Sequence, residues 1–135
     1  MIVIDASVTL AWCLADEADE YAERMLERVV SESAAAPAHW PLEVANGIRT
    51  AERRDRLKED EIADIARLVD NLGIEVVPVE LTTALWSVLD LAREHNLSAY
   101  DAGYLGLARH RGLPLATLDD SLRAACKRAG VEVAV

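Results

Sequence analysis

The sequence predicts an α/β protein of three layers, in which helices cover both faces of a central, mostly parallel sheet of about five strands. Two observations predict this class. Short apolar runs without polar alternation recur along the chain, as expected of strands that are buried on both faces. Amphipathic stretches of helical length separate these runs, and strands joined in parallel need such crossovers. The 135 residues suit one domain, 1–135, with a single core.

Each expected strand is short and apolar. The run 74–79 is the clearest because it is rich in β-branched residues, and Ala34–Pro37 is the weakest. In chain order, the expected strands are Ile2–Ile4, Ala34–Pro37, 74–79, 115–118 and 131–135. Functional groups in such sheets lie outside the carboxyl ends of the strands.

The expected helices carry apolar residues three and four positions apart. Tyr21, Met25 and Val29 show this spacing, Pro41 suits the first turn of a helix, and Gly73 is a natural end. In chain order, the helices are expected over 6–14, 17–30, 41–51, 62–72, 83–95, 98–110 and 121–129.

Composition limits the function classes. The net charge of -10 argues against passive binding to phosphate backbones, so any role with nucleic acid must depend on local cations or a bound metal. Cys13 and Cys126 match no zinc or redox spacing, which favours two free thiols. The sequence shows no signal peptide and no membrane span, and we expect a cytoplasmic protein.

Four carboxylates stand at positions that a parallel sheet brings to one edge. Asp5 follows the first expected strand, Asp119 follows the strand 115–118, and Glu43 and Asp101 begin helices. Gathered there, they would repel one another and take up protons unless a cation neutralised them. An all-carboxylate set fits Mg²⁺, or alternatively Mn²⁺.

Each acid also has a purely structural explanation. Asp5 could cap the helix that follows it, and the dipole of its helix favours Glu43. Asp101 completes a capping box with the serine three residues before it. Either Asp119 or Asp120 could cap the last helix, and the doubled aspartate leaves open which of the two turns inward.

Four segments, VIDASV, PLEVANGI, SAYDAGYLGLA and LATLDDSL, occur in this order along the chain. Together they resemble a PIN-domain ribonuclease, the toxin of a VapBC-type toxin–antitoxin pair, over essentially the whole chain. The resemblance implies catalytic and metal-binding roles for Asp5, Glu43, Asp101 and Asp119. It implies that further side chains orient these acids, namely Ser7, Asn46 and Thr117, with Asp120 as a cap or outer acid.

The implied activity is Mg²⁺-dependent hydrolysis of single-stranded or looped RNA by water, which leaves 5′-phosphate and 3′-hydroxyl ends. Glu43 would complete the metal cluster or orient the attacking water. The implied partners are an antitoxin, whose tail lies across the cleft, and a second copy of the chain, which gives a homodimer and a heterotetramer or larger assembly with antitoxin.

Two surfaces could serve such partners. The cations Arg49, Arg53 and Arg54, with two more up to residue 58, could guide RNA, or they could form an ordinary solvated helix end. The first helix has more apolar residues than one stripe needs, which predicts a partner surface or extra core at Val8, Leu10, Trp12 and Leu14. We expect Trp40 and Trp86 in the core, and His39, His95 and His110 on the surface or with satisfied hydrogen bonds.

Three other classes compete with the ribonuclease. A haloacid-dehalogenase-type phosphatase needs a second aspartate where this chain has Ser7. A phosphoacceptor receiver domain needs paired acids after the first strand and an aspartate after the middle strand, where this chain has Glu80 and Leu81. An inactive relative that only binds a partner is disfavoured by the intact set of acids.

Overall fold

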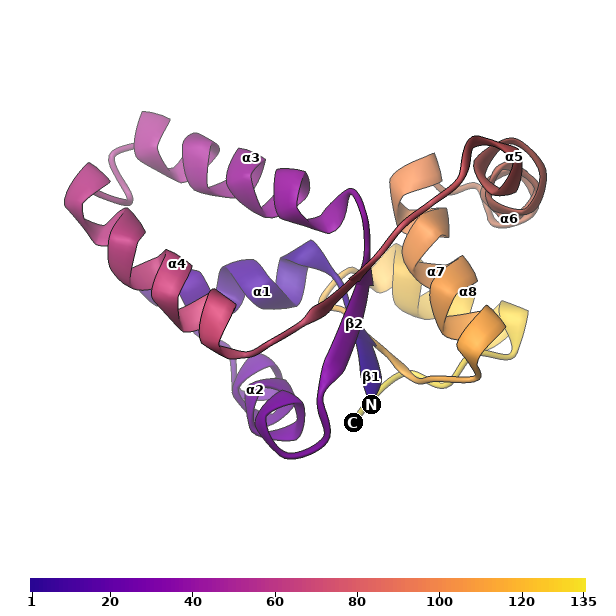
Figure 1. Cartoon of the computed structure of the whole chain (residues 1–135), viewed down its shortest axis with the longest axis horizontal. Coiled ribbons are helices and arrows are strands. Elements are labelled where there is room, and N and C mark those ends of the chain that lie inside the picture. The colour runs from indigo at the N-terminus through magenta and orange to yellow at the C-terminus, as the bar shows by residue number, and fades with distance from the viewer.

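The structure, a computed structural model that describes residues 1–135, contains a four-stranded sheet in the order β3-β2-β1-β4. All neighbouring strands pair in parallel, which confirms the predicted α/β class. The strands are β1 (Ile2–Ile4), β2 (Ala34–Pro37), β3 (Glu75–Val77) and β4 (Leu115–Ala116). Figure 1 shows the sheet between two groups of helices, with the two termini close together.

Helices connect the strands and cover both faces of the sheet. Helices α1 to α4 lie on one side in Figure 1, and α5 to α8 on the other. The helices are α1 (Ala6–Cys13), α2 (Glu20–Glu32), α3 (Trp40–Arg53), α4 (Ile62–Asn71), α5 (Leu81–Thr83), α6 (Leu89–His95), α7 (Ala99–Arg111) and α8 (Asp120–Ala129). Shorter turns are η1 (Ala15–Glu17), η2 (Glu59–Glu61) and the π-helical η3 (Ala84–Val88).

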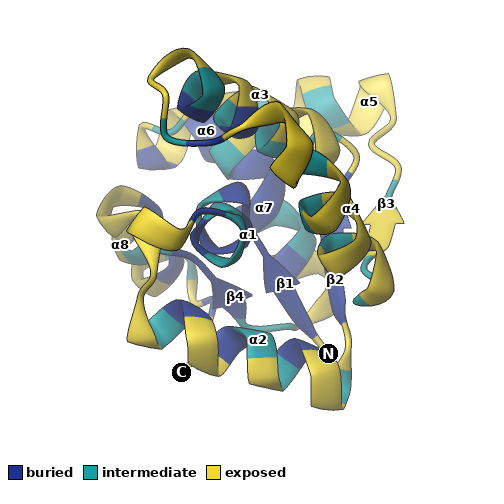
Figure 2. Ribbon diagram, turned by 90° about the vertical axis from the view of Figure 1, so that its left-hand side faces the viewer, coloured by how far each residue is buried: buried dark blue, intermediate teal, exposed yellow.

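The core lies around β1 and the helix that follows it. All three residues of β1 are fully buried, and α1 runs through the middle of the molecule (Figure 2). β2 is built from three buried alanines before Pro37. With only 4% aromatic residues, the interior is packed from Ala, Val, Ile and Leu. This rigid centre fixes the carboxyl ends of β1 and β4, which are neighbours in the sheet.

The expected fifth strand, 131–135, does not form. Val133 makes one isolated bridge to Leu115, supported by two backbone hydrogen bonds between Leu115 and the residues on either side of Val133. The reason is the length of β4, which has two residues because Pro114 precedes it and the chain turns away at Thr117 to form the acidic edge. A partner strand cannot extend beyond the strand with which it pairs.

Two expectations about single residues, Trp86 and His95, are wrong. Trp86 is 73% exposed and not in the core, whereas Trp40 is buried as expected. At the first helix, the alternative of extra core holds for Val8 and Leu14, which are buried because α2 and α3 both pack on α1, whereas Leu10 and Trp12 are only partly buried. His95 is buried, and neither ring nitrogen has a hydrogen-bond partner.

No helix has the length and apolar character needed to cross a bilayer.

Candidate active site

Asp5 stands where β1 ends and α1 begins. Its carboxylate is only 4% exposed, yet it accepts hydrogen bonds from Ser7 Oγ at 2.6 Å, from the Val8 amide at 3.1 Å and from Thr117 Oγ1. Burial raises the pKa of Asp5 to about 6; these bonds oppose the shift, and the nearby charge of Asp101 adds to it. Asp5 therefore caps α1, as its structural explanation requires. Unlike an ordinary capping residue, it is buried, and its charged form is disfavoured.

Two hydroxyls tie the carboxyl ends of β1 and β4 together. Ser7 Oγ accepts from the Leu118 amide at 2.9 Å, and Thr117 Oγ1 accepts from the Asp119 amide at 3.0 Å. Because the same hydroxyls donate to Asp5, they fix the carboxylate of β1 against the backbone that follows β4. We name this group, Asp5, Ser7, Thr117 and Asp119, the strand half of the site.

Asp119 rather than Asp120 belongs with the other acids. Asp119 Oδ1 caps α8 by accepting from the Leu122 amide at 2.8 Å, and its charge raises the pKa of Asp101. Asp120 lies in the first turn of α8, is exposed and makes no side-chain hydrogen bond. Both aspartates are exposed, so the charge interaction of Asp119 with Asp101, and not burial, favours Asp119 as the acid of the site.

Glu43 and Asp101, which we name the helix half, begin α3 and α7. Partial burial and the charges of Asp119 and Glu43 raise the pKa of Asp101. The Asp101 amide donates to Ser98 Oγ at 3.1 Å, but the Asp101 carboxylate does not accept a hydrogen bond from the Ser98 amide. The predicted capping box is therefore only half formed. The Asp101 carboxylate accepts no hydrogen bond at all, which leaves it free for a ligand.

Two residues near Glu43 were missed by the sequence prediction of the site. Tyr104 Oη donates to Glu43 Oε1 at 2.9 Å, and His39 Nε2 lies 3.4 Å from the same oxygen. His39 also lowers the pKa of Asp101, against the stronger effects of burial and neighbouring acids. Their spacing was the available signal, because His39 precedes Glu43 by four positions and Tyr104 follows Asp101 by three.

The other predicted residues are less involved. Asn46 is exposed, one turn after Glu43, and its side chain orients none of the carboxylates. Arg53 and Arg54 are exposed at the end of α3, and Arg49 lies 3.9 Å from Glu52. The neighbouring Arg56 is neutralised by a bidentate bond to Asp16 and a third bond to Glu17, so it is not available to an RNA phosphate.

The four carboxylates share one edge, but they do not form a preassembled group of three or more metal ligands. What joins them is electrostatic, since Asp101 is coupled to each of the other three. The donors are all hard oxygens. Burial is the main cause of the raised pKa values of Asp5 and Asp101, and the charges of neighbouring acids, which a divalent cation would neutralise, add to both. By the chemistry of its donors, the residue set fits a hard divalent cation, which Asp5, Glu43, Asp101 and Asp119 would have to close around to hold.

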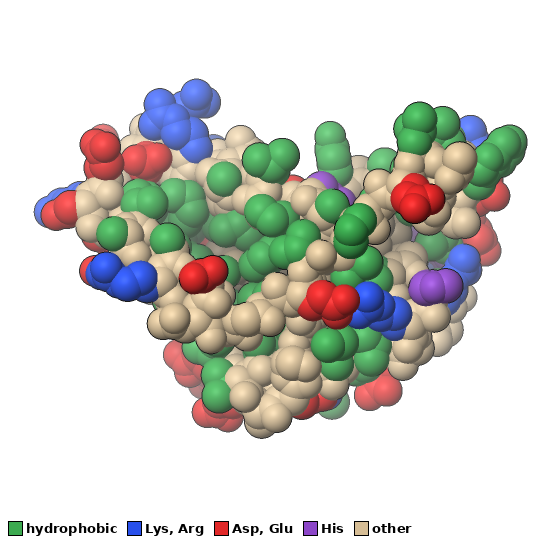
Figure 3. All heavy atoms as spheres, in the orientation of Figure 1, with side chains coloured by type: hydrophobic (Ala, Val, Ile, Leu, Met, Phe, Trp, Pro, Cys, Tyr) green, Lys and Arg blue, Asp and Glu red, His purple; other side chains and the backbone are tan.

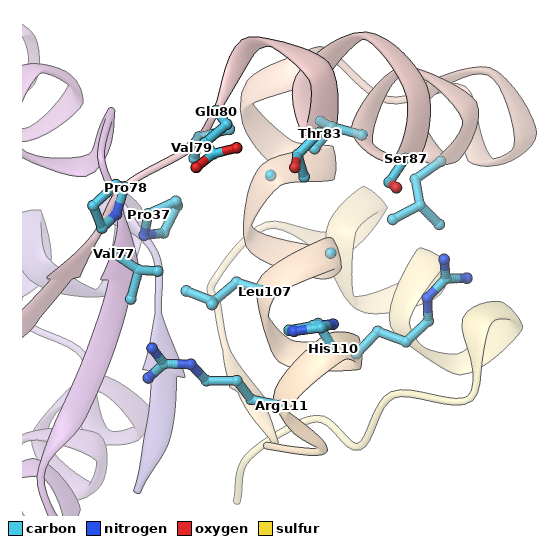
Figure 4. Close-up of a pocket in the computed structure, with 15 residues that line it drawn as sticks. Pro37, Val77, Pro78, Val79, Glu80, Thr83, Ser87, Leu107, His110 and Arg111 are labelled. Atoms are coloured by element: carbon cyan, nitrogen blue, oxygen red, sulfur yellow. The ribbon is translucent and has the colours of Figure 1, made fainter.

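A hollow of about 550 Å³ begins beside this edge and runs along α7 (Figure 4). None of the four carboxylates lines it. Its walls come from the ends of β2 and β3, from α5 to α6 and from α7, and they include the hydroxyls of Thr83 and Ser87. At its far end, Arg111 is paired with Glu75 at 2.7 Å, whereas Arg109 forms no ion pair.

Fold and site together define a class: a small parallel α/β protein with a set of acids at the carboxyl ends of its strands and the starts of the neighbouring helices. The comparisons identify the family, because the model of the PIN domain matches residues 2–128. This chain belongs to the PIN-domain family.

Two curated relatives align over most of the chain. Ribonuclease VapC3 of Pyrobaculum aerophilum is 31% identical over 121 residues, which cover 90% of this chain and 91% of the relative. Ribonuclease VapC9 of Mycobacterium tuberculosis is 32% identical over 120 residues, 88% of this chain and 86% of the relative.

Solved structures have the same fold. PAE2754 from Pyrobaculum aerophilum superimposes with a TM-score of 0.68 at 27% identity, over 92% of this chain and 84% of the other. FitAcB from Neisseria gonorrhoeae gives a TM-score of 0.67 at 20% identity, over 98% of this chain and 96% of the other. A toxin–antitoxin complex from Klebsiella pneumoniae gives a TM-score of 0.58 at 15% identity, over 88% of this chain and 87% of the other. The similarity to this complex and to FitAcB concerns the fold alone.

Proposed function

We propose that this chain is a divalent-metal-dependent endoribonuclease, the toxin of a type II toxin–antitoxin pair. One observation carries the proposal: in a member of the PIN-domain family, four carboxylates from four separate segments are electrostatically coupled at one sheet edge. Curated relatives that align over about nine-tenths of the chain are named ribonucleases. Divalent-metal dependence is general among PIN-domain ribonucleases.

The residues divide the work between the two halves of the site. Asp5, whose carboxylate is fixed by the strand-end hydroxyls, would hold the cation together with Asp119 and Asp101, and we propose Mg²⁺. When bound, Mg²⁺ neutralises phosphodiester charge and lowers the pKa of water. Glu43 completes this set or orients the attacking water. Hydrolysis by water then leaves 5′-phosphate and 3′-hydroxyl ends.

The product ends test this mechanism. We expect purified protein to cleave RNA in Mg²⁺, to stop in a chelator, and to leave ends that accept ligation as 5′-phosphates. An Asp101→Asn protein prepared in the same way should leave the RNA intact. A 2′,3′-cyclic phosphate product would exclude attack by water, and equal cutting by both proteins would indicate a contaminating nuclease.

We propose that RNA approaches along unpaired cations on two sides of the crevice. Arg53 and Arg54 are exposed at the end of α3, and Arg109 borders the hollow along α7. These positions resolve the conflict with a net charge of -10, because phosphates respond to local potential near the contact.

We also propose an antitoxin and a second copy of the chain as partners, since two apolar surfaces support them. A groove of about 580 Å³ between α3 and α4 is lined mainly by hydrophobic residues (Figure 3). A separate patch around α5 and η3 exposes Val79, Leu81, Leu85 and Trp86. The cytoplasmic location stays a prediction.

A further inference from the structure

Glu43 is held in a way that no other acid of the site shares. The Tyr104 side chain, which is 1% exposed, brings its hydroxyl to 2.9 Å from Glu43 Oε1. His39 Nε2 lies 3.4 Å from the same oxygen. No hydrogen bond reaches Oε2. Tyr104 therefore hydrogen-bonds one oxygen of Glu43 with His39 beside it, and the other oxygen is free.

His39 is itself fixed in orientation. Its Nε2 lies 2.9 Å from the backbone carbonyl oxygen of Tyr100. A carbonyl can only accept, so Nε2 carries the proton of the ring and donates it to Tyr100. Glu43 Oε1, 3.4 Å from the same nitrogen, is a close neighbour and not a hydrogen-bond partner of His39. The ring also packs edge-on against Tyr104, with centroids 4.9 Å apart, and lies 5.5 Å from the ring of Tyr100. Rotation of His39 would break all of these contacts.

Gly103 provides the room that His39 needs. A Cβ atom at residue 103 would lie 2.7 Å from His39 Cε1, a separation that real Cβ atoms do not show. One turn later, a Cβ atom at Gly106 would meet Leu91 Cδ1 at 3.4 Å, an ordinary contact. Glycine inside a helix costs about 1 kcal/mol relative to alanine. At residue 103, the absence of a side chain is what allows His39 to occupy its position.

We propose that Tyr104 and His39, with Gly103 beneath them, form a clamp that positions Glu43 for its role in the active site. The clamp fixes the rotamer of Glu43 and leaves Oε2 as the oxygen that can meet a cation or a water. Tyr104 and His39 are positioning residues, because they act through Glu43. The clamp rests on the proposed function, since it presupposes that Glu43 serves the metal-dependent reaction.

The first test removes a single hydroxyl. Tyr104→Phe keeps the ring and its packing, and we expect kcat to fall about 10–100-fold, as for loss of a group that orients a metal ligand. KM for RNA should stay unchanged, because Tyr104 is too buried to meet the substrate. Calorimetry with Mn²⁺ on metal-free protein should show weaker binding, as for Glu43→Gln. Tyr21→Phe is the matched control, since that hydroxyl bonds to the Ala134 carbonyl at 2.8 Å, outside the clamp.

The second test compares two glycines of the same helix. Gly103→Ala should displace His39 and lower kcat and Mn²⁺ affinity in the direction of Tyr104→Phe. Gly106→Ala should leave both unchanged, although it makes the same gain in helix propensity. Equal activity and equal Mn²⁺ binding in the two variants would overturn the clamp. If Tyr104→Phe fails to fold, this pair decides the question, because neither variant removes a buried polar group.

A third measurement separates the clamp from the proposed function. In metal-free protein, ¹³C relaxation should report an ordered Glu43 side chain in the wild type and a mobile one in Tyr104→Phe and Gly103→Ala. Equal order in all three would overturn the clamp whatever the activity. Wild-type protein that cleaves no RNA would instead overturn the proposed function, while the relaxation data would still decide whether Glu43 is clamped.

Discussion

The two halves of the acidic crevice are built on different principles. In the strand half, Asp5 accepts three hydrogen bonds, and Ser7 and Thr117 connect it to the backbone after β4. In the helix half, the Asp101 carboxylate accepts none, and Glu43 has partners on one oxygen only. Backbone pairing in the sheet preorganises the first half, whereas the second depends on side chains that reach across from other elements. The strand half should therefore resist perturbation, and the helix half should be adjustable.

The largest expected effect comes from the buried acid of the strand half. Asp5→Asn should lower kcat about 10²–10³-fold, the range for removal of a preorganised electrostatic group. The same change should raise the Tm of metal-free protein at pH 7, because the amide removes the buried charge, keeps the two bonds on Oδ1 and can donate from Nδ2 to Thr117 Oγ1 in place of the bond that Oδ2 accepts. Thermal unfolding beside RNA cleavage measures both. Asp120→Asn is the control, and it should change neither property; a large loss of activity in that variant would mean that the wrong acid of the pair faces the crevice.

The next effect tests the bridge between the strand ends. Thr117→Val keeps the shape of a fully buried side chain but removes the hydroxyl that donates to Asp5 and accepts from Asp119. We expect about a 10–100-fold loss of activity and a loss of about 1–3 kcal/mol in unfolding free energy. Thr50→Val, at a position without such bonds, provides the baseline for both measurements. A Thr117→Val protein as active as that baseline would show that the strand half needs no bridge.

The pH dependence of stability gives a smaller effect of defined sign. The pKa of Asp5 is raised to about 6 in the folded protein, above its value of about 3.9 in the unfolded chain. Between these values the folded state binds more protons, so this group makes the metal-free protein more stable as pH falls from about 6 to 4. Denaturant titrations in that window should show the contribution in the wild type and lack it in Asp5→Asn. An identical slope in the two proteins would contradict the raised pKa.

The smallest effect concerns the outer cations. Replacing Arg53 and Arg54 together by Gln should raise KM for RNA a few-fold and leave kcat unchanged, because these side chains meet only phosphates. The effect should shrink as salt is added. Arg56→Gln is the comparison, since that charge is already neutralised by Asp16 and Glu17. A change in kcat would mean that the cations act on the site itself and not on approach.

Sequence reasoning predicted the strand half more completely than the helix half. Asp5, Ser7, Thr117 and Asp119 are adjacent to strands, and the order of strands in a parallel sheet constrains where their ends meet. It missed His39 and Tyr104, because their helical spacing from Glu43 and Asp101 does not reveal that a helix cap and a helix face from distant segments will meet at Glu43. It also placed Trp86 in the core, since an amphipathic pattern does not reveal whether a neighbour covers that face.

By itself, the sequence determined the α/β class, the order of most elements and the four acids at their edge, because hydrophobic periodicity, turn residues and motif order are local properties. Only the tertiary structure decided the rest: that β4 is too short to support a fifth strand, that α1 packs against both α2 and α3, and that Glu43 accepts a hydrogen bond from a tyrosine with a histidine beside it. These features depend on which surfaces come into contact, and contacts between segments that are distant in sequence are fixed by packing in three dimensions.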